Sequence, residues 1–364
     1  MRRHVRYAVV GLGHIAQVAV LPAFGNARRN SRLAALVSGD PVKRDALSGK
    51  YEVAKTCGYE DYDALLRSGD IDAVYIALPN SMHCDYAVRA AQAGVHVLCE
   101  KPMAVTAEEC ERMARAARER KVKLMVAYRL HFERANLEAA EIARSGRIGE
   151  PRAFSSAFTM HVVPDNIRAR RDMGGGVLYD IGIYCINAAR ALFRDEPIEA
   201  RAMTLGTLGE VEESVAAVLR FPNERIATFV CSFGASKVSH YRLIGTKGDL
   251  VLEPAYEYAG ALKHRLTLEG EAAERRFAKR DQFAPELLYF SDCVLHNRDP
   301  EPSAAEGLAD VRVIEALYRA AASGRPVELA PYQKHERPSL EQEIRRPPID
   351  KPDVVRAQAP SGGS

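Results

Sequence analysis

An apolar run that ends in a glycine-rich turn lies close to the start of this 364-residue sequence. Val5–Val10 is followed by Gly-Leu-Gly-His-Ile-Ala, which has the spacing of a strand–turn–helix unit that binds a dinucleotide. The first glycine permits the tight turn, the second lets the backbone approach a pyrophosphate, and the alanine allows close helix packing. An ordinary glycine turn is the alternative. The residues predicted to hold the cofactor are Gly11, Leu12, Gly13, His14, Ile15 and Ala16.

Strand-like and helix-like segments alternate through the first third of the chain. Thr106 and Glu109 have the spacing of a capping box for the last of these helices. Alternation of this kind predicts a parallel, doubly wound sheet. The expected strands are Arg6–Val10, Leu33–Val37, Ala73–Leu78, Val95–Cys99 and Lys123–Ala127, and the expected helices are Ile15–Asn26, Tyr62–Arg67, Cys84–Ala93 and Ala107–Arg120.

Strand patterns predominate from Pro151 onward, interrupted by one long helix over Val177–Phe193. We expect an α/β protein with an N-terminal Rossmann domain (1–128), a C-terminal α+β domain with a large, mostly antiparallel open sheet (129–330), and an extended proline-rich tail (331–364). The expected later strands are Arg152–Met160, Glu199–Leu205, Val215–Phe221, Ile226–Phe233, Tyr241–Gly245 and Leu262–Leu268, with late helices near Phe283–His296 and Ala304–Ser323 that could pack on either domain.

Charge and composition exclude several classes of partner. The 51 basic and 48 acidic residues are interspersed, which gives no electrostatic reason for a nucleic-acid or membrane partner. No apolar run approaches the roughly 20 residues that span a bilayer. Met1-Arg2-Arg3-His4 leads directly into the first strand and leaves no room for a signal peptide, so a cytoplasmic location is expected. The seven cysteines lack zinc spacing, so we expect reduced thiols and no metal.

The end of the second predicted strand bears on the choice of dinucleotide. NAD-specific domains usually place a carboxylate there to accept a hydrogen bond from the ribose 2′-hydroxyl. Ser38 occupies that position here, Asp40 comes two residues later, and Lys43 and Arg44 follow. A hydroxyl with nearby cations suits a 2′-phosphate, which favours NADP. The alternative is that the two cations are only the solvated start of a helix.

Two further apolar runs end in polar residues. The strand ending at Cys99 is followed by Glu100 and Lys101, and an ammonium at the mouth of a buried strand suggests a role beside the reacting ring of the cofactor. The apolar run that ends at Leu78 is followed by Pro79 and then by polar residues. Among these, Asn80 and His83 could hydrogen-bond a cofactor or cap the next helix, and both alternatives stay open.

A third group of polar residues follows three glycines at 174–176. Asp180 and Tyr184 are four residues apart and therefore lie on one face of the predicted helix. A carboxylate and a phenol so placed could hold a hydroxylated substrate and remove a proton. A phenol loses its proton more easily beside an ammonium, for which Lys101 is the candidate. Ordinary helix packing is the alternative.

Four ordered motifs, G-L-G-H-I-A, A-L-P-N-S-M-H, C-E-K-P-M-A and G-G-G-V-L-Y-D-I-G-I-Y, together resemble the glucose–fructose oxidoreductase and inositol dehydrogenase family. The resemblance covers residues 5–330 and is strongest to the glucose–fructose oxidoreductase branch. It implies that Lys101 contacts substrate and nicotinamide, that Asp180 binds substrate and that Tyr184 is the acid/base. It also implies that Ser38, Gly39, Lys43 and Tyr59 surround the adenosine 2′-phosphate, with Arg129 near the cofactor.

The activity that the resemblance implies is NADP-dependent hydride transfer to or from a sugar, either oxidation of an aldose at C1 or reduction of a sugar carbonyl. D-xylose or trans-dihydrodiol dehydrogenation by the same residues is an alternative. A non-enzymatic NADP-binding regulator is an alternative of another class, against which the presence of Lys101, Asp180 and Tyr184 argues. The resemblance further implies a homo-oligomer, a dimer or tetramer, that forms through the open sheet.

Overall fold

The computed structural model describes residues 4–334, 336–350 and 352–362. The chain forms two compact units: unit 1 falls within Met1–Arg129, Asp281–Gly307 and Arg345–Ser364, and unit 2 within Leu130–Arg280 and Leu308–Ile344. This division differs from the predicted boundaries, because a helical segment near residue 290 and the end of the tail belong to the first unit. Among the described residues, no helix has the length and apolar character needed to cross a bilayer.

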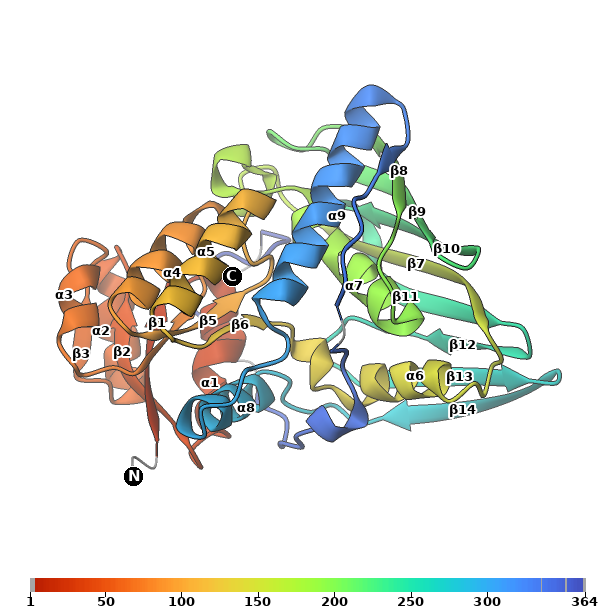
Figure 1. Ribbon diagram of the computed structural model, residues 1–364. Helices are drawn as coiled ribbons and strands as arrows, with labels where there is room; N and C mark the ends of the chain where they lie inside the picture. The colour runs from red at the N-terminus through yellow and green to blue at the C-terminus, as the bar shows by residue number, and fades with distance from the viewer. Residues whose placement is uncertain (1–3, 335, 351, 363–364) are drawn as a thin grey trace. The chain divides into compact units, whose positions relative to one another are not determined.

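Unit 1 contains a six-stranded sheet in which every pairing is parallel (Figure 1). The strand order β3-β2-β1-β4-β5-β6 reverses direction beside β1, so the predicted doubly wound sheet is confirmed. β1 and β4 are almost completely buried, as expected of strands covered on both faces. The strands are β1 (Val5–Val10), β2 (Ser31–Val37), β3 (Lys55–Cys57), β4 (Ala73–Ile76), β5 (His96–Glu100) and β6 (Leu124–Ala127).

The helices of unit 1 largely follow the sequence pattern. The predicted capping box is confirmed, since the Thr106 hydroxyl accepts a hydrogen bond from the Glu109 N–H at 3.2 Å and the Glu109 carboxylate accepts one from the Thr106 N–H. The helix predicted over 15–26 is present over 14–23 and includes a π-helical turn, η1 (Ala16–Val20), and the short α1 (Leu21–Ala23). The others are α2 (Pro41–Tyr51), α3 (Tyr62–Arg67), η2 (Asn80–Met82), α4 (His83–Gln92), α5 (Ala107–Glu119) and α8 (Ala284–Leu295).

Helix α8 lies far along the chain but packs on the first strands of unit 1. The Tyr7 hydroxyl of β1 hydrogen-bonds the Ser291 hydroxyl at 2.7 Å, and the Asn30 side chain donates to the Leu288 carbonyl at 2.9 Å. The sequence left this helix free to pack on either domain. These contacts place it on the dinucleotide-binding unit.

Unit 2 contains a nine-stranded sheet in the order β14-β13-β12-β11-β7-β10-β9-β8-β15. All of its pairings are antiparallel except the parallel pair β7–β10, so the predicted mostly antiparallel sheet is confirmed. Its strands are β7 (Pro151–His161), β8 (Glu199–Leu205), β9 (Ser214–Phe221), β10 (Arg225–Ser232), β11 (Gly234–Gly245), β12 (Gly248–Leu252), β13 (Leu262–Leu268), β14 (Glu271–Phe277) and β15 (Val327–Glu328).

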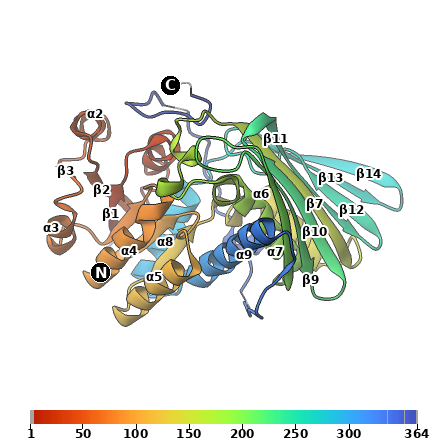
Figure 2. The same cartoon turned by 90° about the horizontal axis from the view of Figure 1, so that it is seen from above.

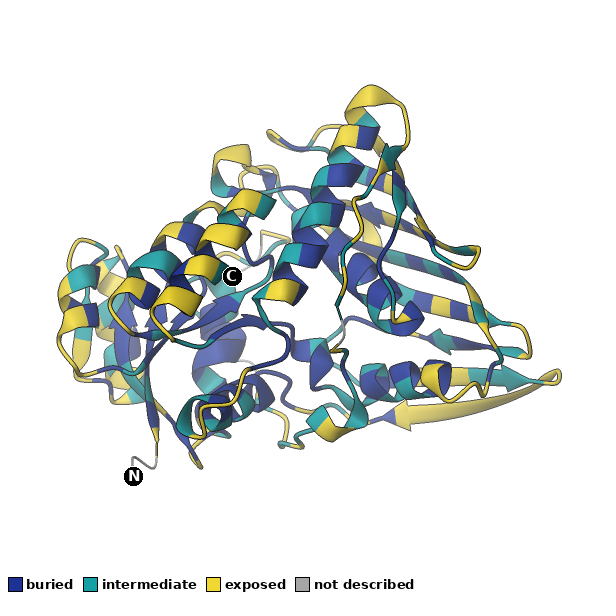
Figure 3. Ribbon diagram, viewed as in Figure 1, coloured by how far each residue is buried: buried dark blue, intermediate teal, exposed yellow. Residues whose placement is uncertain are grey.

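Helices cover one face of this sheet (Figure 2). Cys185 of α7 (Ile183–Phe193) lies 3.3 Å from the Ser156 hydroxyl of β7 and 3.8 Å from the sulfur of Cys231 of β10, which fixes α7 on that face. α6 (Arg134–Arg144) and α9 (Ala304–Ser323, in unit 2 from Leu308) lie on the same side of the sheet. The inward residues are buried, whereas β14 is exposed along most of its length (Figure 3).

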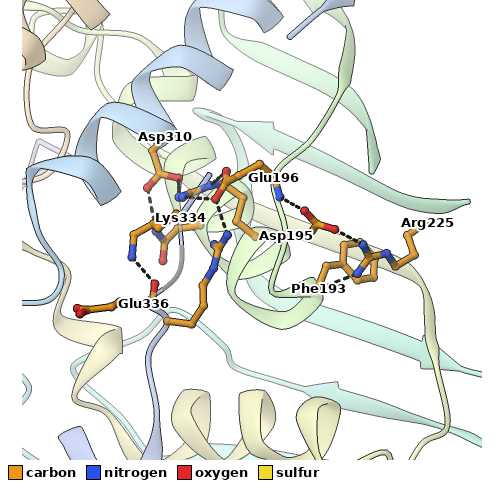
Figure 4. Close-up of polar contacts among 10 residues, drawn as sticks. Phe193, Asp195, Glu196, Arg225, Asp310, Lys334 and Glu336 are labelled. Carbon is orange, nitrogen blue, oxygen red and sulfur yellow. Dashed lines mark hydrogen bonds and ion pairs between the residues drawn. The ribbon is translucent and has the colours of Figure 1, made fainter. Parts of the chain in front are cut away.

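A buried ion-pair network anchors the C-terminal half of α7 (Figure 4). Arg190 is fully buried, and its guanidinium pairs with Asp310 of α9 and, at 2.6 Å, with Glu196. Arg337 of the tail adds a second contact to Glu196 at 2.6 Å. Because a buried charge without its partner is strongly destabilising, these pairs hold α7 in one position. All seven cysteines are free, and six of them are buried.

Candidate active site

The predicted cofactor residues meet at one edge of the first sheet. β1, β2, β4, β5 and β6 are parallel, so their carboxyl ends lie at the same edge. Ligands of doubly wound sheets bind outside this edge, where the strand order reverses. The residues that follow the five strands there are Gly11, Ser38, Pro79, Lys101 and Arg129.

The glycine turn after β1 has the close approach that its sequence predicts. Gly11 has a φ of +93°, and a Cβ on it would lie 2.5 Å from the carbonyl oxygen of Ala77. A Cβ on Gly13, in contrast, would meet no atom of the described residues within 4 Å. The turn is therefore packed against β4 on one side and open at Gly13, where the first helical turn begins. This geometry fits a pyrophosphate on the N–H groups of that turn.

Four of the predicted residues gather at the end of β2. The Ser38 hydroxyl accepts a hydrogen bond from the Asp40 N–H at 3.2 Å, while the Asp40 carboxylate caps α2 by accepting from the Lys43 N–H. Burial raises the pKa of Tyr59, whose phenol also contacts the Ser38 hydroxyl and the Gly39 backbone. Asp40 is thus engaged as a helix cap. No carboxylate takes the place of Ser38.

His83 connects the loops that follow β4 and β5. It is fully buried, and its ring nitrogens lie 2.9 Å from the carbonyl oxygens of Leu78 and Pro102. Burial lowers the pKa of His83. Because both ring nitrogens contact backbone, we propose that His83 positions the flanking loops, while Pro79 and Asn80, which are half-buried, are left as the candidates for cofactor contact.

Lys101 lies beside an unusual set of buried polar groups. The Glu100 carboxylate accepts a hydrogen bond from the Tyr75 hydroxyl at 2.8 Å, and Arg129 donates to the Gln282 side chain. Burial raises the pKa of Glu100, an effect that the charges of Lys101 and Arg129 oppose. The Lys101 ammonium and the Glu100 carboxyl group, both half-buried, therefore lie together at the edge of the sheet.

Glu286 of α8 belongs to the same cluster, and the sequence did not point to it. It is fully buried, and neither carboxylate oxygen has a hydrogen-bond partner among the described residues. Burial, reinforced by the negative charge of Glu100, raises the pKa of Glu286 well above its usual range. The native state therefore favours the protonated, neutral carboxyl group.

Glu286→Gln is expected to change how stability depends on pH. A folded pKa raised above the unfolded value, about 4.3, gives stability that is complete below that value and is lost as pH rises through the folded pKa. Glutamine cannot ionise, so the difference in Tm between variant and wild type should move in favour of the variant from pH 5 to pH 9. Thermal unfolding across that range measures this difference. A difference that does not vary with pH would show that Glu286 is ionised in the native state.

In unit 2, the predicted substrate residues lie at the start of the helix on the covered face of the sheet. Asp180 lies in the π-helical turn η6 (Leu178–Gly182), and its carboxylate accepts a hydrogen bond from the Arg168 guanidinium at 2.8 Å. Asp180 and Arg168 retain 18% and 23% side-chain exposure, so the pair remains accessible to a ligand. Arg168 also contacts the Asn166 side chain, which holds the guanidinium in place. The sequence did not assign this partner to Asp180.

Tyr184 lies in the first turn of α7 and packs among other aromatic rings. Its ring centroid lies 5.5 Å from that of Phe158 and 5.7 Å from that of Tyr256, while its side chain is half-buried. The glycines before η6 are needed for close packing: Gly176 has a φ of +137°, and a Cβ on it would lie 2.5 Å from the Tyr318 hydroxyl. Asp180 and Tyr184 are therefore held on a rigid turn. Lys101 and the cofactor loops belong to unit 1.

Comparison with known proteins agrees with this architecture. A family model described as "Oxidoreductase family, NAD-binding Rossmann fold" matches residues 5–128, and one described as "GFO/IDH/MocA C-terminal domain" matches residues 136–251. D-xylose 1-dehydrogenase [NADP(+)] of Haloarcula marismortui is 34% identical over 340 residues, which cover 89% of this chain and 93% of that protein.

Comparison with solved structures points to the same family of proteins. The crystal structure of aldose-aldose oxidoreductase from Caulobacter crescentus, complexed with glycerol, is 39% identical with a TM-score of 0.86 and covers 90% of this chain and all of that one. A 3-ketoreductase from Actinomadura kijaniata, in complex with NADP and TDP-benzene, is 27% identical with a TM-score of 0.80 and covers 87% of this chain and 98% of that one. The chain belongs to the GFO/IDH/MocA family of oxidoreductases.

Proposed function

We propose that the protein is an NADP-dependent oxidoreductase that transfers hydride between nicotinamide and a sugar, by oxidation of an aldose at C1, reduction of a sugar carbonyl, or both. The observation that carries this proposal is the presence of Lys101, Asp180 and Tyr184 in a chain that matches an NADP-dependent xylose dehydrogenase and an aldose-aldose oxidoreductase over about nine tenths of its length. The glucose–fructose oxidoreductase branch is the proposed subgroup.

The residues at the carboxyl edge of the first sheet fit NADP. The open backbone at Gly13 would receive the pyrophosphate, and Ser38 with Lys43 would receive the adenosine 2′-phosphate. Bound NADP supplies the nicotinamide carbon that accepts or gives the hydride. The other proposed cofactor contacts are Leu12, His14, Ile15, Ala16, Gly39, Tyr59, Pro79, Asn80, Glu100 and Arg129.

We assign a separate task to each of the three central side chains. Tyr184 takes the proton from the substrate hydroxyl during oxidation and returns it during reduction. Lys101 places a positive charge beside the oxygen that loses its proton and so makes that loss easier. Asp180, oriented by Arg168, accepts hydrogen bonds from other hydroxyl groups of the sugar. A role in binding sugar hydroxyl groups explains why the Asp180 carboxylate stays partly exposed although it is paired with the Arg168 guanidinium.

Two measurements on the purified full-length protein test the proposal. Mass spectrometry of ligand released on denaturation should detect NADP or NADPH, and a panel of aldoses with NADP and with NAD should give turnover. Turnover with D-xylose alone would favour the xylose dehydrogenase alternative that the Haloarcula relative suggests. NADP binding without turnover of any sugar or dihydrodiol would favour a non-enzymatic regulator.

Ser38→Asp is expected to move cofactor preference from NADP toward NAD. The new carboxylate would repel the 2′-phosphate and accept a hydrogen bond from the free ribose hydroxyl. Ser38→Ala is the matched control, since it deletes the hydroxyl without adding charge and should leave the preference for NADP in place. The measurement is kcat/KM with each cofactor. A wild type that uses NAD better would show that the residue at the end of β2 does not select the cofactor.

The uncovered face of the second sheet is the proposed homo-oligomer interface. Register places the exposed Ile244 and Ile226 in one row across β11, β7 and β10, and Val230 and Met203 in another across β10, β9 and β8. Exposed apolar rows of this kind mark association surfaces. Light scattering after gel filtration should therefore give a dimer or tetramer, and a monomer at micromolar concentration would contradict this proposal.

A further inference from the structure

The C-terminal tail crosses the dinucleotide loop of unit 1. Gln17 is 1% exposed, and its amide nitrogen donates to the carbonyl oxygens of Leu12 and Val355, both at 2.9 Å. Its amide oxygen accepts a hydrogen bond from the Val355 N–H at 2.7 Å. One buried side chain therefore joins the backbone of the glycine turn to the backbone of the tail. This arrangement fixes the position of the residues on either side of Val355.

Other contacts hold the tail along unit 1. The Asn26 side chain donates to the Pro347 carbonyl at 3.0 Å, and Arg346 donates to the Asn26 carbonyl at 3.1 Å. Further along, the Lys50 ammonium of α2 donates to the Asp353 carbonyl at 3.3 Å. Ala357, just beyond Val355, is only 7% exposed. The segment is thus attached to the helical turn after β1 and to the helix after β2.

Arg356 lies between the attached Val355 and the buried Ala357, close to the end of β2. Its guanidinium is 3.6 Å from the Asp40 carboxylate, and its side chain is 63% exposed. Arg356 has a φ of +47°, a conformation that non-glycine residues seldom adopt. The fixed positions of Val355 and Ala357 hold it there. The tail therefore brings a solvent-facing guanidinium to the residues proposed to receive the adenosine ribose.

The negative charge of Asp40 makes a further cation favourable for binding a phosphate beside Ser38. Asp40 follows Ser38 closely, and its negative charge would repel a phosphate dianion beside Ser38. The Arg44 guanidinium is engaged with the Ser38 carbonyl. Desolvation raises the pKa of Asp40, but backbone hydrogen bonds from Lys43 and Val42, together with the charges of Arg356 and Lys43, lower it overall. A guanidinium also matches the geometry of a phosphate better than an ammonium does.

We propose that Arg356 is a cofactor-specificity residue that the C-terminal tail supplies to the 2′-phosphate of NADP. This inference rests on the proposed function, and it adds a residue more than 300 positions away from the strand end that it serves. In the bound state, the guanidinium exchanges its contact with Asp40 for the phosphate or bridges the two. Residues 353–357 are then part of the cofactor site.

The test is the affinity of the full-length, cofactor-free protein for NADP and for NAD, measured by calorimetry at low and high salt. Arg356→Gln is expected to weaken NADP binding about fivefold to tenfold at low salt, and less at high salt, because the side chain is solvent-exposed. NAD affinity should stay within about twofold. Arg28→Gln, at an exposed position of the same unit, is the matched control and should change neither affinity.

Binding of adenosine 2′,5′-bisphosphate and of AMP distinguishes a failure of this inference from a failure of the proposed function. Arg356→Gln should weaken binding of the bisphosphate and spare AMP. If wild type prefers NADP but Arg356→Gln keeps the full preference, the inference about Arg356 is wrong and the proposed function stands. If wild type binds NAD better than NADP, the proposed cofactor itself is wrong.

Discussion

Replacement of Lys101 by alanine is expected to lower kcat by about 10²–10⁴-fold, the usual contribution of a positioned acid–base group. Lys101 follows β5 at the carboxyl edge of the sheet, next to the half-buried Glu100. In the proposed mechanism its charge acts on the proton that is being transferred, whereas the dinucleotide is assigned mainly to the glycine turn and the end of β2. NADP affinity should therefore change far less than kcat. Steady-state kinetics together with calorimetry separate the two effects.

Lys55→Ala is the matched control for this variant. Lys55 begins β3 at the opposite end of the strands and forms a surface ion pair with Asp70, with 44% of its side chain exposed. Loss of such a pair has a small effect on stability and should leave kcat unchanged. A Lys101→Ala enzyme with a kcat within twofold of wild type would remove Lys101 from the mechanism.

Tyr184→Phe should reduce sugar oxidation by at least about 10²-fold without a comparable loss of stability. Phenylalanine keeps the ring that packs against Phe158 and Tyr256, and it removes only the hydroxyl oxygen. NADP binding should persist, because the cofactor's phosphates and adenosine are assigned to unit 1. Steady-state kinetics, calorimetry with NADP and measurement of Tm test these expectations.

Tyr256→Phe is the control for this variant, and we expect it to lose stability and to keep its turnover. The Tyr256 hydroxyl is buried and hydrogen-bonds the Ser156 hydroxyl at 2.7 Å, so its loss should cost about 0.5–1.5 kcal/mol of stability. Turnover should remain. If Tyr184→Phe instead loses stability and keeps its turnover, Tyr184 is a core residue, and Asp180 becomes the candidate base.

The order of strands and helices followed from the sequence wherever hydrophobic periodicity was strong. The helix over Ala304–Ser323 and the strands β8 and β13 have their predicted bounds. β14 was missed because six of its seven residues are exposed, which leaves no alternation of apolar and polar positions. β3 was missed because it has only three residues. The helix after Gly13 ends at Ala23, three residues before its predicted end, and is followed by turns.

Prediction of the site from the sequence was limited in the same way, because local motifs could be recognised and their partners from distant parts of the chain could not. The glycine turn, Lys101, and the pair Asp180 and Tyr184 lie within short motifs. Glu286 reaches the surroundings of Glu100 only because α8 packs back on the first sheet. The approach of Arg356 to Asp40 likewise depends on the path of the tail. No periodicity or spacing signals contacts between segments so far apart.

Isotope transfer tests the central claim most directly. D-glucose or D-xylose carrying deuterium at C1 would be incubated with the enzyme and NADP, and the NADPH formed would be analysed by mass spectrometry. Hydride transfer from C1 predicts NADPH that carries one deuterium, and unlabelled sugar predicts NADPH without it. NADPH without label from the deuterated sugar, or no NADPH from any aldose of the panel, would contradict the assignment of this protein as an aldose C1 oxidoreductase.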